Sequence, residues 1–174
     1  MGMITQSPIL IVLGGLPGTG KTTLARELTR RLEATYLRID AIEQTLRAAD
    51  NAVGPMGYVV ANELAAENLK LGRVVIADCV NPVLASRAGW RQTASRESAW
   101  IIEIEVVCSD ARLHQQRVET RTSDIDGLKL PTWDEVLNRD YEPWDREHLV
   151  LDTAVSSLDE LLQQAEAYVR DKAG

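Results

Sequence analysis

An octapeptide near the start of the chain restricts its fold more than any other feature. Residues 15–22 read Gly-Leu-Pro-Gly-Thr-Gly-Lys-Thr and match the phosphate-binding pattern G-x-x-x-x-G-K-[ST]. Gly15, Gly18 and Gly20 let the backbone curl with its N–H groups pointing inward, in conformations that a Cβ would obstruct. An apolar run at residues 9–13 precedes the loop and a segment with helical spacing follows it. A buried strand and a helix therefore flank the loop, which argues against a plain glycine-rich turn.

Each part of this loop has an expected task. Lys21 supplies a positive charge for the outer phosphates of a nucleotide, and the Thr22 hydroxyl can ligate Mg²⁺. The positive end of the following helix faces the same phosphates. The residues expected to bind the nucleotide are Gly15, Leu16, Pro17, Gly18, Thr19, Gly20, Lys21, Thr22 and Thr23.

Length, composition and charge limit the class of protein. A chain of 174 residues with 45% hydrophobic residues fits one compact domain with a core. The formal net charge of −7 argues against a nucleic-acid polymer as partner but leaves room for a nucleotide or an RNA end. Cys79 and Cys108 lack the spacing of metal ligands and are expected to be free, buried thiols in a reducing cytosol. Neither a membrane-length apolar run nor a signal peptide is found, so we expect a cytoplasmic protein.

Strand and helix patterns alternate along the chain. Strands are expected at residues 9–13, 36–39, 74–77, 100–107 and 148–151. Helices are expected at about residues 41–48, 57–71, 83–97, 110–121, 132–141 and 157–172. This order predicts an α/β fold in which helices cover both faces of a parallel sheet. Ligands of such sheets bind at the carboxyl ends of the strands, so the residues that follow each strand are the candidates for function.

The order of these motifs resembles that of the small P-loop kinases, a group with an AAA-type P-loop ATP-binding domain. The group includes gluconate, shikimate and adenylylsulfate kinases, chloramphenicol phosphotransferase and the kinase domain of polynucleotide kinase. The similarity runs from Gly15 to the strand near Leu151. It implies a three-layer P-loop NTPase fold with a five-stranded parallel sheet, formed by residues 1–174 as one domain. It also implies a short lid at about residues 110–131 and transfer of the γ-phosphate of ATP to an acceptor.

Two candidate residues follow the second strand. The carboxylate of Asp40 could accept the proton of an attacking hydroxyl group, which phosphoryl transfer needs more for orientation than for basicity. With Glu43 three residues on, Asp40 is also a good helix N-cap, so both roles stay open. Arg47 resembles the arginine that these kinases use on an anionic acceptor, although an exposed helix arginine needs no such role.

Two further candidates follow the third strand. Asp78 closes the apolar run 74–77 in a pattern similar to a Walker B motif, and we expect it to hold Mg²⁺ through water beside Thr22. Asn81 precedes a proline and is therefore a candidate N-cap of the next helix. The Asp-x-x-Asn stretch of polynucleotide-kinase-like members implies a different role for Asn81, namely contact with the acceptor.

The next two helices carry the remaining candidates. Arg87 and Trp90 lie on one side of a helix and either line the acceptor pocket or pack in the core. Arg117 and Arg121 share a helix face and match the Arg-x-x-x-Arg pair of the family lid. An arginine delivered by a lid stabilises the charge that spreads over the γ-phosphoryl oxygens. The alternative for this pair is a solvated helix face.

Together these residues predict an ATP- and Mg²⁺-dependent kinase for a small hydroxyl-bearing acceptor. The expected catalytic residues are Lys21, Asp40, Arg117 and Arg121, and the expected acceptor contacts are Asp40, Arg47, Asn81 and Arg87. One alternative is a nucleic-acid-end kinase, which the stretch from Asp78 to Asn81 favours. The other is a nucleotide-dependent switch that hydrolyses ATP slowly and has no acceptor.

Overall fold

The computed structural model describes residues 7–50 and 52–174, and within them five strands form one all-parallel sheet of order β2-β3-β1-β4-β5. The strands are β1 (Ile9–Gly14), β2 (Thr35–Arg38), β3 (Val74–Asp78), β4 (Trp100–Val107) and β5 (Leu149–Asp152). The helices are α1 (Lys21–Leu32), α2 (Ile39–Ala48), α3 (Met56–Lys70), α4 (Leu84–Arg96), α5 (Ala111–Thr120), α6 (Trp133–Leu137) and α7 (Leu158–Ala173). The predicted α/β fold with a five-stranded parallel sheet is confirmed.

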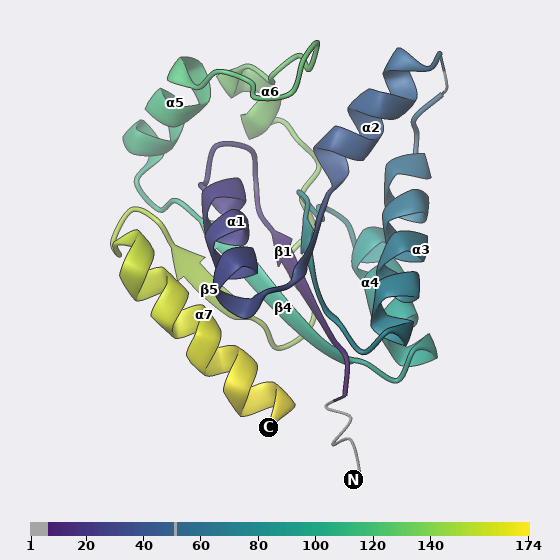
Figure 1. Cartoon of the computed structure of the whole chain (residues 1–174). Coiled ribbons are helices and arrows are strands. Elements are labelled where there is room, and N and C mark those ends of the chain that lie inside the picture. Colours follow the sequence, from purple (N-terminus) through teal and green to yellow (C-terminus); the bar gives the residue numbers. More distant parts are fainter. Residues whose placement is uncertain (1–6, 51) are drawn as a thin grey trace, which may run out of the picture.

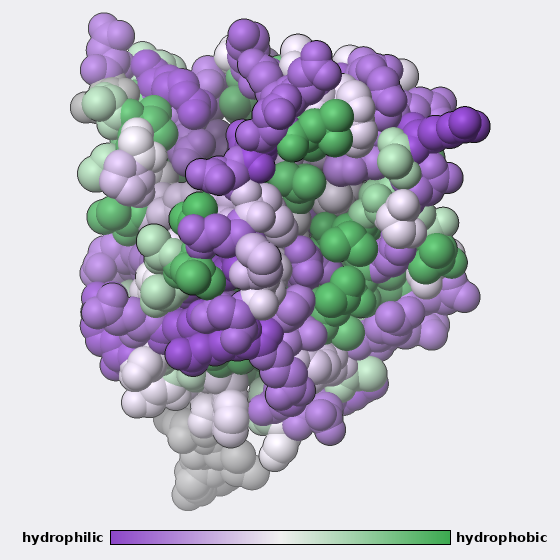
Figure 2. Space-filling model, turned by 180° about the vertical axis from the view of Figure 1, so that it is seen from behind, coloured by the Kyte–Doolittle hydropathy of each residue, from purple (hydrophilic) through white to green (hydrophobic). Residues whose placement is uncertain are grey.

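Side chains of the central strand alternate between two cores. Ile11 and Leu13 pack with residues of α1 and α7 on one face, whereas Leu10 and Val12 pack with α3 and α4 on the other (Figure 1). Because β1 is buried on both faces, its sequence is a continuous apolar run and does not alternate. Figure 2 shows the molecule from behind: that face is mostly hydrophilic, with a column of hydrophobic residues on the right and smaller hydrophobic groups on the left. Most of the large apolar side chains are therefore used in the two cores.

Several element boundaries differ from those predicted, and two of the differences change how a residue or segment is interpreted. Strand β2 ends at Arg38 and α2 begins at Ile39, so Asp40 lies in the first turn of the helix and not at the end of the strand. The helix predicted over residues 132–141 ends at Leu137. Beyond it, the Tyr141 hydroxyl donates to Glu105 on β4, and Glu142 precedes a proline, which disfavours helical backbone.

The carboxyl ends of the inner strands meet at one edge of the sheet. Asp78 at the end of β3 lies in register with Leu13 of β1 and with Arg38 of β2. The loops that follow β1 and β3, together with the start of α2, therefore converge there, and α5 with the loop after it lies beyond the same edge (Figure 1). This edge is where ligands of parallel sheets bind.

Two expectations from composition can be compared with the structure. Cys79 and Cys108 are free and buried, as predicted. Across the described ranges, every helix is too short or too polar to cross a bilayer.

Candidate active site

The loop between β1 and α1 has the backbone that phosphate binding requires. Gly15 and Gly18 have positive φ angles of 138° and 83°. A Cβ at Gly18 would lie 2.5 Å from the Val118 side chain, so any other residue would clash with α5. Helix α1 begins at Lys21 without a side-chain N-cap bond. Its first N–H groups are therefore available to an anion, as at other phosphate-binding helix ends.

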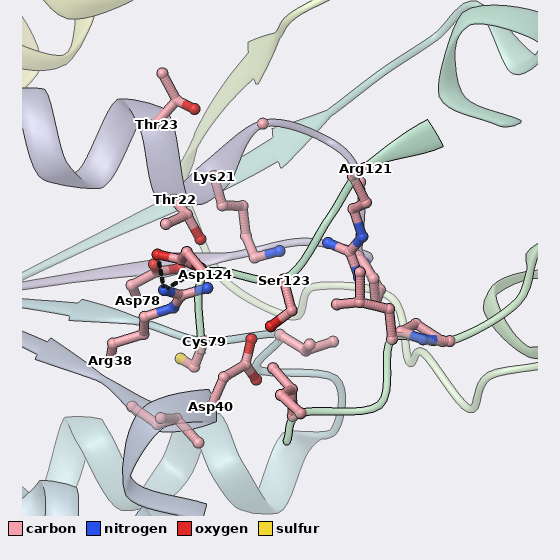
Figure 3. Close-up of a pocket in the computed structure, with 18 of the residues that line it drawn as sticks. Lys21, Thr22, Thr23, Arg38, Asp40, Asp78, Cys79, Arg121, Ser123 and Asp124 are labelled. Atoms are coloured by element: carbon pink, nitrogen blue, oxygen red, sulfur yellow. Dashed lines mark hydrogen bonds and ion pairs between the residues drawn. The ribbon is translucent and has the colours of Figure 1, made fainter. Parts of the chain in front are cut away.

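A cavity of about 1140 Å³ lies between the phosphate loop and the segment that follows α5, residues 121–131. Such a volume exceeds the roughly 300–1,000 Å³ of a pocket for one drug-sized ligand. Its walls come from the phosphate loop, the start of α2, the end of β3, the end of α5 and residues 121–131. Figure 3 shows side chains from these separate segments pointing into one space. The cavity has room for a nucleotide and a second molecule.

Lys21 lies at the floor of this cavity and is buried, with 8% of its surface exposed. Its Nζ donates a hydrogen bond to the carbonyl oxygen of Leu16, 3.1 Å away, and is held within the loop. Burial lowers the pKa of Lys21 below its usual value of 10.5, and the nearby carboxylates of Asp78 and Asp40 oppose this effect. The phosphate loop thus holds a costly buried cation that lacks a direct ion pair among the described residues.

Asp40 points into the cavity from the first turn of α2 (Figure 3). The N-cap of that helix is Arg38, which makes no side-chain capping bond, so the alternative of Asp40 as N-cap is wrong. Within residues 7–50 and 52–174 its carboxylate has no hydrogen bond or ion pair. A carboxylate without a partner among the described residues therefore faces the cavity.

Asp78 closes β3, as predicted, and is buried beside the phosphate loop. Its Oδ2 accepts a hydrogen bond of 2.7 Å from the hydroxyl of Tyr36 on β2. Burial and the adjacent Asp78 carboxylate raise the pKa of Tyr36, so this hydroxyl stays protonated.

The residues around Asp78 fit the requirements of Mg²⁺. Thr22 and Asp78 both line the cavity and offer oxygen ligands. The described residues contain no cluster of three or more acidic, histidine or cysteine side chains suited to a metal. Mg²⁺ is usually held by one or two protein groups together with water and substrate phosphates, so Thr22 and Asp78 are a sufficient protein contribution.

On the wall opposite the phosphate loop, α2 presents Glu43 and Arg47. Arg47 is exposed at the rim, and its Nη2 donates to Glu43 Oε2 at 3.4 Å. Burial and the neighbouring Asp40 raise the pKa of Glu43 above its usual value. Both signs of charge therefore line the side on which an acceptor would bind.

Arg87 does not line the cavity, which corrects one of the two roles expected for it. It is fully buried, and its guanidinium donates to the carbonyl oxygens of Asn81, Pro82, Glu142 and Pro143. The guanidinium also lies 4.5 Å from the centre of the Trp144 ring. Arg87 therefore ties the loop after β3 to the chain segment before β5, and Trp90 is buried in the core beside it.

Asn81 also lies outside the cavity wall. It is fully buried with a φ of 51°, and the residue that caps α4 is Val83, so the N-cap alternative for Asn81 is wrong. Its side-chain amide has no hydrogen-bond partner among the described residues. In this arrangement Asn81 does not reach the space between Asp40 and Lys21.

The two arginines of α5 are held differently. Arg117 Nη1 donates to the hydroxyl of Thr153 at 2.6 Å, and that hydroxyl donates to the Thr19 carbonyl in the phosphate loop at 2.7 Å. Arg121, at the C-cap of α5, points toward Lys21 (Figure 3), and its Nε is buried without a partner among the described residues. Arg117 therefore braces the phosphate loop, whereas Arg121 faces the open cavity.

Sequence reasoning missed three residues at the mouth of the cavity. They form two ion pairs that share one carboxylate: Asp124, in the loop after α5, pairs with Arg38 and with Arg26 on α1. Arg38 could have been selected by the rule that was applied to Asp40, because it closes the same strand. Asp124 could not, since 86 residues separate it from Arg38 in the sequence.

Comparisons with known proteins agree with this geometry. The sequence model of a family described as AAA domain matches residues 10–140. A segment of 70 residues, 40% of this chain, is 33% identical to the ATPase family protein 2 homolog of Caenorhabditis elegans, and it covers 10% of that protein.

Solved structures share the fold at low sequence identity. The APS kinase CysC of Mycobacterium tuberculosis, in complex with AMPPNP and APS, has a TM-score of 0.73 and 17% identity over 94% of this chain and 98% of that chain. A gluconokinase from Sinorhizobium meliloti 1021 has a TM-score of 0.68 and 18% identity over 97% of this chain and 95% of that chain. These likenesses establish a P-loop NTPase fold of the kind found in small kinases.

Proposed function

Because this chain belongs to the AAA domain family, whose sequence model matches residues 10–140, we propose that it is an ATP- and Mg²⁺-dependent phosphotransferase. It transfers the γ-phosphate of ATP to a hydroxyl group of a small-molecule acceptor. The observation that carries this proposal is the free carboxylate of Asp40, which shares one cavity with Lys21 and Arg121. In this proposal residues 1–174 form one kinase domain in the cytoplasm, with residues 110–131 as its lid.

The proposed mechanism assigns one task to each side of the cavity. Backbone N–H groups of the loop and the Lys21 ammonium bind the phosphates of ATP. Thr22 and Asp78 would hold Mg²⁺, which supplies neutralisation of the phosphate charge. Asp40 orients the acceptor hydroxyl and takes its proton, and Arg121 stabilises the charge that develops on the transferred group. Arg47 contacts the acceptor at the rim.

The proposed kinase activity is tested by searching for an acceptor in a metabolite extract. We expect ADP production from ATP and Mg²⁺ to rise at least tenfold when a pooled metabolite extract is added, and a phosphorylated product to be detected by mass spectrometry. A nucleotide-dependent switch would hydrolyse ATP at the same rate with and without the extract. The similarity of a 70-residue segment to an ATPase family protein is the observation that favours the switch alternative.

A nucleic-acid-end kinase is less well supported. The stretch from Asp78 to Asn81 favoured it in the sequence, but Asn81 is buried away from the cavity. The net charge of −7 also disfavours binding to a polymer of phosphates. Adding 5′-hydroxyl oligonucleotides to the same assay separates this function from a small-molecule kinase.

The two arginines of α5 should differ in their kinetic effects. Arg121→Ala is expected to lower kcat about a hundredfold with little change in the KM for ATP, because its guanidinium faces the cavity. Arg117→Ala is expected chiefly to raise the KM for ATP, because Arg117 braces Thr153 and through it the phosphate loop. Steady-state kinetics measure both, with the exposed Arg112→Ala on the same helix as control. An unchanged kcat in Arg121→Ala would show that Arg121 has no catalytic role and would favour the alternative of a solvated helix face.

A further inference from the structure

Three segments of the chain meet at the carboxylate of Asp124. Arg38, at the end of β2, donates from Nη1 to both Oδ1 and Oδ2 of Asp124 at 2.9 Å (Figure 3). Arg26, on α1, donates from Nη2 to Oδ2. Asp124 itself lies in the loop that follows α5. Two cations from the sheet side of the molecule therefore hold one anion that belongs to the lid.

Arg38 is only partly satisfied by this contact. Its side chain is 14% exposed and lines the cavity. A guanidinium has five N–H donors, yet Arg38 donates to Asp124 only through Nη1. The Nε of Arg38 is buried without a partner among the described residues. Such a group can gain further hydrogen bonds from a ligand that has more oxygen atoms than a carboxylate.

Other cations face the same space. Lys21 and Arg121 line the cavity with Arg38; burial and, to a lesser degree, the charge of Arg38 lower the pKa of Arg121, whereas the charge of Asp40 opposes this effect. The Nε of Arg121 is also buried without a partner among the described residues. Two guanidinium groups with unpartnered Nε atoms, close to the Lys21 ammonium, indicate a place for an anion although Asp40 and Asp78 also lie nearby.

We propose that Arg26 and Arg38 form a second oxyanion subsite, and that the lid carboxylate of Asp124 competes for it with a phosphate-type group. That group is either the γ-phosphate of ATP or a phosphate or sulfate group of the acceptor. The proposal deepens the proposed function and rests on it for its biological meaning. The binding itself can be measured without turnover.

The energies favour exchange at this position. Asp124 is about half exposed, with 48% of its side chain accessible, so solvent weakens its ion pairs with Arg26 and Arg38. Arginine binds phosphate through charge-assisted, often bidentate hydrogen bonds that are stronger than neutral ones. The hydrogen bond from Arg26 and the contact with Arg38 lower the pKa of Asp124 to about 2, so the competing carboxylate is charged at neutral pH. A phosphate group can therefore displace it without a change of protonation.

The competition can be measured with inorganic phosphate as the probe. The protein is saturated with ADP and Mg²⁺, and phosphate is titrated by isothermal calorimetry. Asp124→Asn keeps the size of the side chain but removes its charge, so we expect phosphate to bind about tenfold more tightly. The matched control is Asp126→Asn, which removes an exposed charge from the same loop and is expected to leave the affinity unchanged.

The subsite itself is tested with Arg38→Gln. Phosphate binding is expected to fall at least tenfold, also in the Asp124→Asn background, whereas Arg30→Gln on α1 has no effect because Arg30 pairs only with Glu27 among the described residues. Arg26→Gln is a second test that leaves the cavity wall intact. Melting temperatures verify folding. If phosphate affinity were the same in Asp124→Asn and Asp126→Asn, Asp124 would be a structural latch and the proposal would be overturned.

A second titration identifies the source of the phosphate-type group. If the γ-phosphate uses the subsite, Arg38→Gln weakens AMPPNP but not ADP, and inorganic phosphate no longer binds the AMPPNP complex. If an acceptor group uses it, both nucleotides bind Arg38→Gln normally and phosphate still binds the AMPPNP complex of the wild type. Absence of any effect of Arg38 in both titrations would refute the subsite. Failure of the metabolite-extract assay would refute the kinase and leave these binding results intact.

Discussion

We expect Lys21→Ala to abolish the proposed phosphoryl transfer and to weaken ATP binding, while the fold survives. In the proposed function the Lys21 ammonium binds the outer phosphates from within the loop, and Lys129, the other lysine that lines the cavity among the described residues, lies in the segment after α5. Removing it deletes charge stabilisation both in the bound nucleotide and in the transferred group. Loss of transfer should exceed a hundredfold, measured as product formation at saturating ATP. Lys70→Ala, which removes an exposed lysine from α3, is the control.

Without nucleotide, Lys21→Ala should be at least as stable as the wild type. The pKa of Lys21 is lowered in the folded protein, so the charged form destabilises the fold at neutral pH. The destabilisation of the fold by the buried charge decreases as the pH rises through the lowered pKa toward 10.5. Lys21→Ala has no charge at this position and is therefore free of this destabilisation. Thermal unfolding at pH 7 measures the difference. Full transfer activity in Lys21→Ala would refute the phosphate loop, and a fall in melting temperature would instead make Lys21 a structural residue.

Asp40→Asn and Asp78→Asn should damage different steps. We expect Asp40→Asn to lower transfer to the acceptor by about 10²–10⁴-fold, the range of a lost general base. ATP binding and slow hydrolysis by water should remain nearly intact, because Asp40 makes no hydrogen bond within the described residues that the amide would break. Rates of product formation and of background hydrolysis separate the two effects.

Asp78→Asn should impair every reaction of the site, including background hydrolysis. It should also raise the Mg²⁺ concentration needed for tight ATP binding, a readout that does not depend on turnover. An asparagine oxygen can still accept the hydrogen bond of Tyr36, so the fold should be retained. Background hydrolysis lost in Asp40→Asn and kept in Asp78→Asn would reverse the two roles. If neither variant affected transfer, the switch alternative would replace the kinase.

The parts of the site that could be predicted depend on short-range sequence signals. The phosphate loop lies within eight consecutive residues, and Asp78 follows directly from its place after a buried strand. Asp40 was assigned to the correct edge of the sheet, although α2 begins one residue before it. In each case local backbone geometry places the side chain, so spacing alone is sufficient.

The parts that could not be predicted depend on contacts between distant segments. Arg87 has the helical spacing of a pocket residue, but four carbonyl groups draw it into the interior, and two of them lie more than 50 residues away. The ion pair of Arg38 with Asp124 likewise joins β2 to the lid loop. The helix predicted to continue to residue 141 ends early because Tyr141 and the segment around it bind β4 and Arg87. Contacts with distant segments determine where these side chains lie, and the spacing of residues in the sequence does not reveal such contacts.

The packing of α5 on the phosphate loop limits which part of the proposed lid, residues 110–131, could move. The His114 ring nitrogen Nε2 lies 2.8 Å from the carbonyl oxygen of Pro17, and Val118 fills the space beside Gly18. With Arg117 bound to Thr153, this helix is fastened to the nucleotide side along its length. In the proposed kinase, opening is therefore expected beyond Thr120, within residues 122–131, as a flap and not as a swinging helical arm. An acceptor that entered under this flap would leave the nucleotide half of the cavity undisturbed, so ATP would bind fully before the acceptor arrives.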